Sequence, residues 1–299
     1  MRVLISGSKG LIGAALLGLL EGKGHPCVPL VRSRDPLVGG QISWDPAGGR
    51  IDKGTLEGLD AAVHLAGESI AARWTEAKKA RIRDSRITGT RLLATALAGV
   101  SSPPRVLVCA SAVGYYGDGG DEILREDSPK GRGFLSDVCR EWEEAAAAAS
   151  GRGIRVVHLR FGPVLAASGG ALGRMLAPFK AGLGGRIGSG RQWMSWISVD
   201  DAAGAAHHAL ITASLRGPVN AVSPGPVTNA GFASTLARVL RRPALLPLPA
   251  FAARLALGEM ADELLLWGQR VEPAKLLATG YSFRHPDLEE ALRDLLTRP

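Results

Sequence analysis

The sequence of 299 residues predicts an α/β fold, a doubly wound parallel sheet with helices on both faces and a smaller lobe after it. Strand-like apolar segments alternate with helix-like ones as far as about residue 165, and the strands are rich in β-branched residues. A glycine-rich loop follows the first strand directly. Hydrophobic residues make up 46% and charged residues 21%, which is ordinary for a globular domain, and no apolar run is long enough to predict a membrane span.

The first half of the chain alternates regularly between the two kinds of element. Its first helix is expected to end at Gly24, because glycine tolerates the left-handed conformation that follows many helices. A long charged helix follows the fourth strand. We expect strands at 2–6, 26–32, 40–44, 61–67, 105–111 and 154–162, and helices at 11–24, 76–97 and 132–148.

The second half has a looser pattern of glycine-rich loops between helices. Residues 217–240 predict a strand, a Pro-Gly turn and a helix capped around Thr228 and Asn229. The acidic pair Asp200 and Asp201 is expected to cap the helix that follows it, because negative charge is favourable at a helix N-terminus.

These patterns divide the chain into two parts. Residues 1–165 are expected to form the sheet domain, and residues 166–299 a smaller, mainly helical region packed on it. Part of 185–225 is expected to return to the sheet.

Cysteine spacing and charge exclude several kinds of site. Cys27, Cys109 and Cys139 lack the paired spacing of zinc sites and disulfide frameworks, so each is expected to be a small buried residue. His64 lies within an apolar strand and is expected to be a core residue with its hydrogen bonds satisfied. No metal site is predicted. The net charge is +8, but Lys and Arg look scattered, so nucleic acid is not an expected partner.

The glycine-rich loop carries the strongest functional signal. Gly7, Gly10 and Gly13 follow a strand, open a helix and have the spacing GxxGxxG. Small residues there let the backbone approach a pyrophosphate at the positive end of the helix, and let that helix pack on the sheet. We therefore predict a Rossmann-type dinucleotide site at this loop, including the intervening residues Ser8, Lys9, Leu11 and Ile12.

The end of the second strand indicates which dinucleotide binds. NAD-binding proteins usually have an acidic residue there, whereas this strand ends in Arg32, Ser33 and Arg34. Arginine complements a 2′-phosphate through charge-assisted hydrogen bonds, so NADP is the expected cofactor. The alternative is a solvated charged loop. At the end of the fourth strand, the small residues Ala66 and Gly67 leave room for the cofactor.

The chain resembles the extended short-chain dehydrogenase/reductases, the group that contains nucleotide-sugar epimerases and dehydratases. It is most similar to the epimerase family branch, which ends in a small extra C-terminal domain. The resemblance runs from end to end and implies that Leu65, Arg86 and Val164 join the glycines and Arg32 in lining the NADP site. The stretches that carry it are "SGSKGLIG", "AAVHLAGESI", "RWTEAKKARIRDSRITGTRLL", "SAVGYYG", "EDSP", "WEEAA", "RFGPVL", "GLGGRIGSGRQWMSWISVDD", "NAVSPGPVTNAGFA" and "LATGYSF".

One feature of the family's active enzymes is missing. Those enzymes have a Tyr-x-x-x-Lys pair on the helix after the fifth strand, which transfers a proton while the cofactor exchanges hydride. Alignment on Glu143 puts these positions at Leu135 and Cys139, and a shift of one residue puts them at Phe134 and Val138. No tyrosine in the chain is followed four residues later by lysine.

The remaining candidates for chemistry lie at the end of the fifth strand. The family's serine position falls on Ser111 or Ala112, depending on which tyrosine of the doublet Tyr115–Tyr116 is counted from. Ser111 is a candidate for bonding a substrate carbonyl or the nicotinamide amide. One of the two tyrosines is a candidate general acid; the alternative is that both only shape the pocket.

The substrate side is expected around residues 187–201. Trp193 and Trp196 either form an aromatic wall near Arg191 or belong to the core between the two parts. Arg160 is expected to orient this loop rather than contact ligand.

Three functions remain open at this stage. The first is an NADP-dependent oxidoreductase or epimerase-like enzyme with a rebuilt acid–base site, acting on a small molecule such as a carbonyl compound or nucleotide sugar. The second is a non-catalytic NADP-binding protein that senses redox state or regulates a partner, and the third is a true nucleotide-sugar epimerase. A cytoplasmic protein with no membrane partner is expected, because the N-terminus lacks the layout of a signal peptide. A homodimer is plausible by resemblance.

Overall fold

The computed structural model describes residues 1–32 and 40–297. Two residues predicted to bind the cofactor, Ser33 and Arg34, lie outside the described residues.

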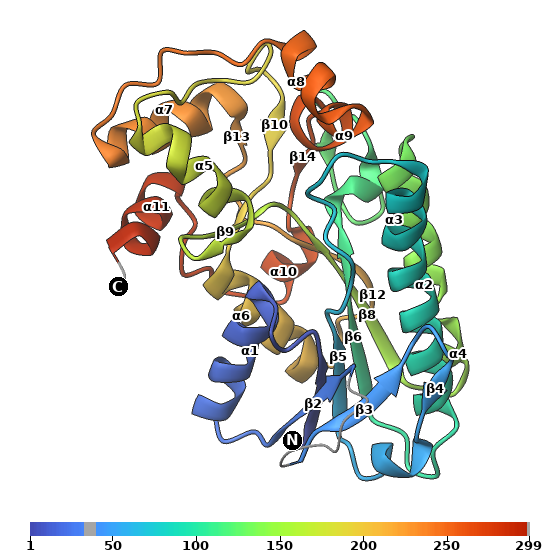
Figure 1. Cartoon of the computed structure of the whole chain (residues 1–299). Helices are drawn as coiled ribbons and strands as arrows, with labels where there is room; N and C mark the ends of the chain where they lie inside the picture. The colour runs from blue at the N-terminus through green and yellow to red at the C-terminus, as the bar shows by residue number, and fades with distance from the viewer. Residues whose placement is uncertain (33–39, 298–299) are drawn as a thin grey trace.

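An eight-stranded sheet forms the centre of the molecule, as predicted (Figure 1). Every neighbouring pair is parallel except the last, β3 with β4, and the strand order is β12-β8-β6-β5-β1-β2-β3-β4. Because the order reverses between β1 and β5, a crevice is expected there at the carboxyl ends of the strands. The strands are β1 (Val3–Ser6), β2 (Cys27–Val31), β3 (Ile42–Asp45), β4 (Arg50–Ile51), β5 (Ala61–His64), β6 (Val106–Ala112), β8 (Arg155–Phe161) and β12 (Gly217–Ala221).

Helices cover both faces of this sheet (Figure 1). On one face lie α1 (Leu11–Gly22) and α6 (Val199–Ile211); on the other lie α2 (Glu76–Ala98), α3 (Phe134–Glu144) and α4 (Ala147–Gly151). Successive strand residues point to opposite faces, so Val3 and Ile5 pack toward the first pair of helices and Leu4 toward the second group. Since both faces are buried, the strands are continuously apolar, which is why they were recognisable in the sequence.

The lobe beside the sheet has its own apolar core. Trp196, Phe232 and Leu236 lie fully inside it, between helices from three separate parts of the chain. The lobe comprises β9 (Val164–Ala166) paired with β11 (Ile197–Ser198), β10 (Trp193–Met194) paired with β13 (Val227–Thr228), and the helices α5 (Gly170–Lys180), α7 (Asn229–Leu240), α8 (Ala250–Leu257) and α11 (Leu288–Thr297).

A C-terminal segment lies between the sheet and the lobe. Its β14 (Arg270–Val271) pairs in parallel with β7 (Ile123–Leu124), far earlier in the chain. It also contains α9 (Glu259–Ala261), a π-helical turn at Asp262–Leu266 and α10 (Ala274–Ala278). Two 3₁₀ helices, Lys53–Leu56 and Val113–Tyr116, complete the described elements.

Several sequence expectations were met and others need correction. Thr228 caps α7 as predicted, through a hydrogen bond from the amide of Gly231. Asp200 and Asp201 lie in the first turn of α6, but its cap is Ser198, whose hydroxyl accepts from the amide of Asp201. β12 returns to the sheet within 185–225, as expected, and none of the described helices could span a membrane.

Candidate functional site

The glycine-rich loop is shaped by contacts that exclude side chains. Gly7 has φ +71°, and a Cβ there would lie 2.8 Å from the carbonyl carbon of Leu65. A Cβ on Gly13 would lie 2.1 Å from the carbonyl oxygen of Gly7, because α1 sits directly on the loop. The amide of Gly10 donates to that same oxygen at 2.9 Å. Gly7 and Gly13 are therefore required by the turn and the helix packing, as the sequence predicted.

The N-terminus of α1 is free to receive an anion. Gly10 occupies the cap position and no side chain caps the helix, while the first turn carries no acidic residue. The amides of Leu11, Ile12 and Gly13 have no hydrogen-bond partner among the described residues. Backbone donors aligned with a helix dipole favour phosphate groups. Ser8 is buried beneath this loop and Lys9 is exposed beside it.

The neighbouring strand end is tied to β1 by a serine. The hydroxyl of Ser6 accepts from the amides of Leu65 and Ala66 and lies 2.6 Å from Nδ1 of His64. Because that hydroxyl already accepts from two amides, its single proton is donated to Nδ1. The proton of the neutral imidazole is therefore on Nε2. Burial lowers the pKa of His64 to about 4. His64 is a core residue as predicted, but its buried Nε2 has no hydrogen-bond partner within 1–32 and 40–297, whereas the sequence interpretation assumed that its hydrogen bonds were satisfied.

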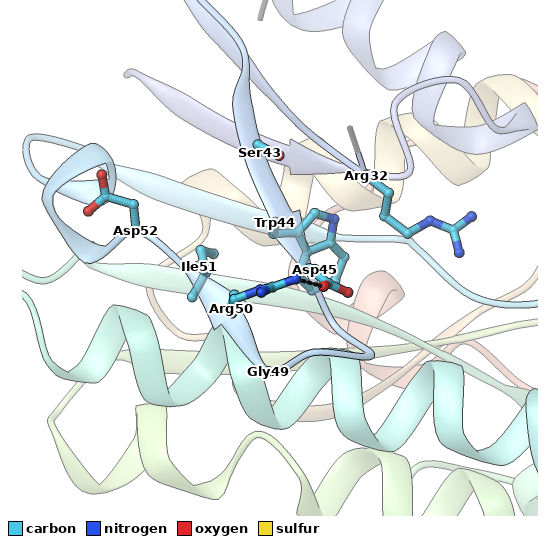
Figure 2. Close-up of a pocket in the computed structure, with 8 residues that line it drawn as sticks. All are labelled: Arg32, Ser43, Trp44, Asp45, Gly49, Arg50, Ile51 and Asp52. Carbon is cyan, nitrogen blue, oxygen red and sulfur yellow. Dashed lines mark hydrogen bonds and ion pairs between the residues drawn. The ribbon is translucent and has the colours of Figure 1, made fainter. Parts of the chain in front are cut away.

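Arg32 lies at the end of β2, beside a pocket on the β3–β4 hairpin. Figure 2 shows this pocket, in which the other lining residues come from Ser43–Asp45 and from 49–52, and in which Arg50 pairs with Asp45. It lies on the β2 side of the glycine loop and contains none of the predicted catalytic residues. Arg32 is exposed, so its guanidinium is available to an anion.

An acidic residue near Arg32 is already neutralised. The carboxylate of Glu68 accepts from Nζ of Lys78 at 2.6 Å, and this bond lowers its pKa, with smaller contributions from the charges of Lys78, Arg81 and Arg32. The pairing with Lys78 limits the repulsion that a free carboxylate would exert on a phosphate at Arg32.

Arg86 supports the segment after β5 from the long helix α2. Its guanidinium donates to the carbonyl oxygens of Glu68 and Ile82 and packs over the ring of Trp142, 5.0 Å from the centroid. A Cβ on Gly67 would lie 3.4 Å from the Arg86 guanidinium carbon. A Cβ at this distance would make an ordinary van der Waals contact, so Gly67 lies against the Arg86 guanidinium without being required by it.

Val164 lies near the start of the first helix, on the other side of Gly170. It opens β9, and its carbonyl oxygen would be 2.7 Å from a Cβ on Gly170, whose φ is +64°. The same Cβ would lie 3.0 Å from the side chain of Leu11. The lobe thus contacts the glycine loop, and the predicted cofactor residues that the structure describes share one edge of the sheet.

Ser111 belongs to a buried charged cluster. Its hydroxyl donates to Oε1 of Glu143 at 2.7 Å. Both carboxylate oxygens of Glu143 also accept from Arg160, at 2.8 and 2.9 Å, in a bidentate pair. Burial alone would lower the pKa of Arg160, but the hydrogen bonds and charge of Glu143 outweigh this and raise it. Sequence reasoning used Glu143 only as an alignment marker and missed the pair, because Ser111, Glu143 and Arg160 lie on three different elements.

The two tyrosines differ in accessibility. Tyr116 is buried: its hydroxyl donates to Oδ1 of Asn220 at 2.7 Å and accepts from Arg160 at 3.0 Å. Burial raises the pKa of Tyr116 to about 12, although Arg160 opposes the shift. Tyr115 is only partly buried, and the guanidinium of Arg160 stacks 3.5 Å from its ring centroid. Arg160 thus positions the tyrosines rather than the loop at 187–201.

The N-terminus of α3 is closed by the C-terminal segment. The carboxylate of Glu263 accepts from the amides of Phe134 and Leu135, at 2.7 and 2.8 Å. Burial raises the pKa of Glu263, and the two amide bonds only partly oppose the rise. Leu135 packs in an apolar cluster with Trp74, Ile82 and Met260. No local sequence signal could have revealed this contact, since the partners are more than 120 residues apart.

Neither the cysteines nor the histidines provide an obvious metal site. Burial raises the pKa of Cys109 and of Cys139 to about 12, so neither thiol ionises at neutral pH. Asp200, His285 and Asp294 lie close together. Both ring nitrogens of His285 are already bonded, however, one to Ser198 and the other to Asp294.

On the substrate side, the two tryptophans have different surroundings. Trp196 is fully buried in the lobe, which confirms the core alternative for that residue. Trp193 is partly exposed, and its indole donates to Asp121 while Arg270 stacks on its ring. Arg191 is exposed.

Comparison with known proteins agrees with this architecture. The model of the NAD dependent epimerase/dehydratase family matches residues 3–221, and a domain of unknown function (DUF1731) matches residues 248–295. An epimerase family protein of Mycobacterium bovis is 46% identical over 300 residues, covering 99% of this chain and 98% of the relative.

Two solved structures are similar over 99% of this chain. The crystal structure of human epimerase family protein SDR39U1 with NADPH has a TM-score of 0.90 and 40% identity, and is covered to 99%. A nucleoside-diphosphate sugar epimerase from Corynebacterium glutamicum has a TM-score of 0.82 and 37% identity, and is covered to 58%. This chain belongs to the NAD-dependent epimerase/dehydratase family, within the epimerase family proteins that carry the additional C-terminal domain.

Proposed function

We propose that this protein binds NADP(H) along the carboxyl edge of the sheet and acts as an oxidoreductase or epimerase-like enzyme on a small carbonyl compound. One observation carries the proposal: the N-terminus of α1 presents three amides that have no partner among the described residues, where Gly7 in the loop and Gly13 in the helix admit no side chain. The human relative that is 40% identical was crystallised with NADPH, which supports the same cofactor here.

The residues that would bind the cofactor lie at the carboxyl ends of neighbouring strands, one group after another along the sheet. The amides at the start of α1 would hold the pyrophosphate, and Arg32 at the end of β2 would hold the 2′-phosphate. Ser33 and Arg34 remain predicted partners of that phosphate. Leu65–Gly67 and Val164 would line the two sides of the dinucleotide, and Arg86 would hold the chain beside it. When bound, the cofactor supplies a hydride acceptor or donor.

The acid–base role would fall to Tyr115 in place of the family's Tyr-x-x-x-Lys pair. Tyr115 is the partly exposed member of the doublet, at the end of β6, and a guanidinium lies against its ring. Ser111, whose proton is donated to Glu143, would accept a hydrogen bond from the nicotinamide amide while Glu143 fixes its orientation. Tyr116 would position Arg160, because its hydroxyl is already shared between Asn220 and Arg160.

Turnover and binding can be separated experimentally. NADPH oxidation with a panel of carbonyl compounds, followed by absorbance, should identify a substrate for the wild type. Replacing Tyr115 with Phe should lower kcat by about 10²–10⁴-fold and leave NADPH affinity unchanged. No oxidation with any compound, or full activity in Tyr115→Phe, would contradict the proposed enzyme.

A non-catalytic NADP-binding protein is the second candidate. It is favoured by the closed hydrogen bonding of Ser111 and Tyr116, whose hydroxyls are both engaged within the protein. This candidate requires NADPH and NADP⁺ to bind with different affinity or to change a partner interaction. Nucleotide-sugar epimerisation is the third candidate, supported by the description of the Corynebacterium relative, and calorimetry with UDP-glucose would test it.

A further inference from the structure

Positive charge in this chain is concentrated in one stretch. Between Glu144 and Glu259 the only acidic residues are Asp200 and Asp201, against twelve Lys and Arg, so residues 145–258 carry +10. The whole chain carries +8, and the remainder is therefore slightly acidic. The interpretation that basic residues are merely scattered was incomplete, because the absence of acids, not the density of cations, marks this region. Most of residues 145–258 belong to the lobe.

One end of the lobe also exposes large apolar side chains. The linker between α7 and α8 runs over this end, with α8 beside it (Figure 1). The side chains of Leu245, Phe251 and Leu255 are 79%, 72% and 77% exposed. Phe251 and Leu255 are four residues apart on α8 and so lie on one side of that helix. We call this set the apolar face: Leu183, Leu245, Leu246, Leu248, Phe251 and Leu255.

The members of the apolar face from different segments are held together by the backbone. The amide of Leu246 donates to the carbonyl of Gly184, and the amide of Leu248 donates to the carbonyl of Arg186. The carbonyl of Leu248 in turn accepts from Gly188. The linker is therefore a fixed part of the surface, and Leu183 lies next to its leucines.

The backbone of the linker has few unsatisfied donors. Pro243, Pro247 and Pro249 have no amide hydrogen, and the amides of Leu246 and Leu248 are bonded as described. An apolar solvent penalises free backbone donors, so this arrangement lowers the cost of moving the linker out of water. An ordinary surface loop has no need of such pairing.

Cations flank the segments of the apolar face along the chain. Lys180, Arg241 and Arg242 are exposed and make no side-chain hydrogen bond or ion pair with any residue that the structure describes. Lys180 precedes Leu183 by three residues, and Arg241 and Arg242 begin the linker that carries Leu245. Arg254 also lies on α8 and pairs with Asp262. Protruding apolar side chains flanked by cations match the boundary between the headgroups and acyl chains of an anionic bilayer.

We propose that this end of the lobe docks the protein peripherally on a membrane that contains anionic phospholipid. Leu245, Phe251 and Leu255 would enter the acyl boundary, while Arg241 and Arg242 would contact lipid phosphates. This inference is independent of the proposed cofactor chemistry and revises the sequence-based expectation of no membrane partner. No helix needs to cross the bilayer.

Sedimentation with vesicles tests the proposal on the full-length protein. Vesicles of phosphatidylcholine with about one-third phosphatidylglycerol should bring down the protein, and pure phosphatidylcholine or high salt should do so at least tenfold less. The double variant Leu245→Ser/Phe251→Ser should lower the partition coefficient at least tenfold, since both side chains would enter the bilayer. Arg241→Ala/Arg242→Ala should lower it only for the anionic vesicles.

Matched controls separate docking from general surface effects. Ile211→Ser removes an apolar side chain of α6 that is 55% exposed, and Arg81→Ala/Arg91→Ala removes two exposed cations from α2; neither should change vesicle binding. Failure of the wild type to sediment with anionic vesicles would overturn the proposal. So would a wild-type dimer on size exclusion that Leu245→Ser/Phe251→Ser converts to monomer without any vesicle binding, because the face would then join two copies.

Discussion

The sheet and the lobe use their apolar residues in different ways. In the sheet, Val3, Leu4 and Ile5 are fully buried between two layers of helices, and charged groups in the interior, such as Glu143 and Arg160, are paired. The lobe buries Trp196 and Leu236 in a core of its own, yet leaves six large apolar residues exposed at one end. Apolar residues in the sheet specify the fold, whereas part of those in the lobe remain available to a partner.

The largest effect is expected where the sheet half buries charge. Glu143→Ala should destabilise the protein by about 3–5 kcal/mol, because it leaves Arg160 buried without its bidentate partner. Chemical denaturation would measure this. Glu144→Ala is the matched control: it removes only an exposed pair with Arg140 and should cost less than about 1 kcal/mol. Equal losses in both variants would contradict the importance of the buried pair.

A pH effect of about 3 kcal/mol is expected from His64. Its pKa is about 4 in the folded protein and near 6.5 in the unfolded chain, since burial opposes the charged form. The unfolded chain therefore binds the proton first, and stability is lost as pH falls from about 6.5 toward 4. Unfolding free energies across this range should fall less steeply in His64→Gln than in the wild type. Identical slopes would show that His64 does not contribute.

Within the lobe, replacing a buried leucine and replacing an exposed leucine should have different effects on stability. Leu236→Ala should cost about 2–5 kcal/mol because it opens a cavity in the core. Leu245→Ala, on the apolar face, should change stability by less than about 0.5 kcal/mol. Thermal unfolding of both variants measures the difference. A large loss in Leu245→Ala would mean that this side chain supports the fold and is not free for docking.

A smaller effect on stability, with a large effect on binding, is expected at the glycine loop. Gly13→Ala should cost about 1–3 kcal/mol and weaken NADPH binding at least tenfold, since its Cβ would collide with Gly7 and displace the loop. Gly18→Ala, on the same helix with nothing near its Cβ, should instead stabilise the helix by up to about 1 kcal/mol. Calorimetry with NADPH would show whether binding is weakened only by the substitution that displaces the loop or by either substitution in the helix.

The sheet could be predicted from local sequence patterns, whereas the surroundings of the candidate catalytic residues could not. Each strand, each helix and the Gly7–Gly13 loop depends on residues that lie close together in the sequence, so the sequence pattern alone predicted them. The short strand β4 was missed because its sequence signal is weak. The cap at Ser198 was missed because the acidic pair next to it was expected to be the cap. The contact between Glu263 and α3 depends on tertiary packing between residues 129 positions apart, and no periodicity in the sequence indicates it.

The predicted site residues divide along the same line. Ser111 and the tyrosine doublet were located by resemblance, but only the structure distinguishes buried Tyr116 from partly exposed Tyr115. The ion pair between Glu143 and Arg160 joins α3 to β8, and each residue alone looks like an ordinary charge in the sequence.

The central claim concerns Arg32 and the glycine loop, and a comparative titration tests it most directly. Calorimetry should show NADPH binding at least tenfold more tightly than NADH to the wild type, because a guanidinium is available at the end of β2. In Arg32→Ala, affinity for NADPH should fall toward that for NADH, while NADH binding stays the same. Wild-type protein that binds neither dinucleotide, or that binds both equally with no effect of Arg32→Ala, would contradict the account.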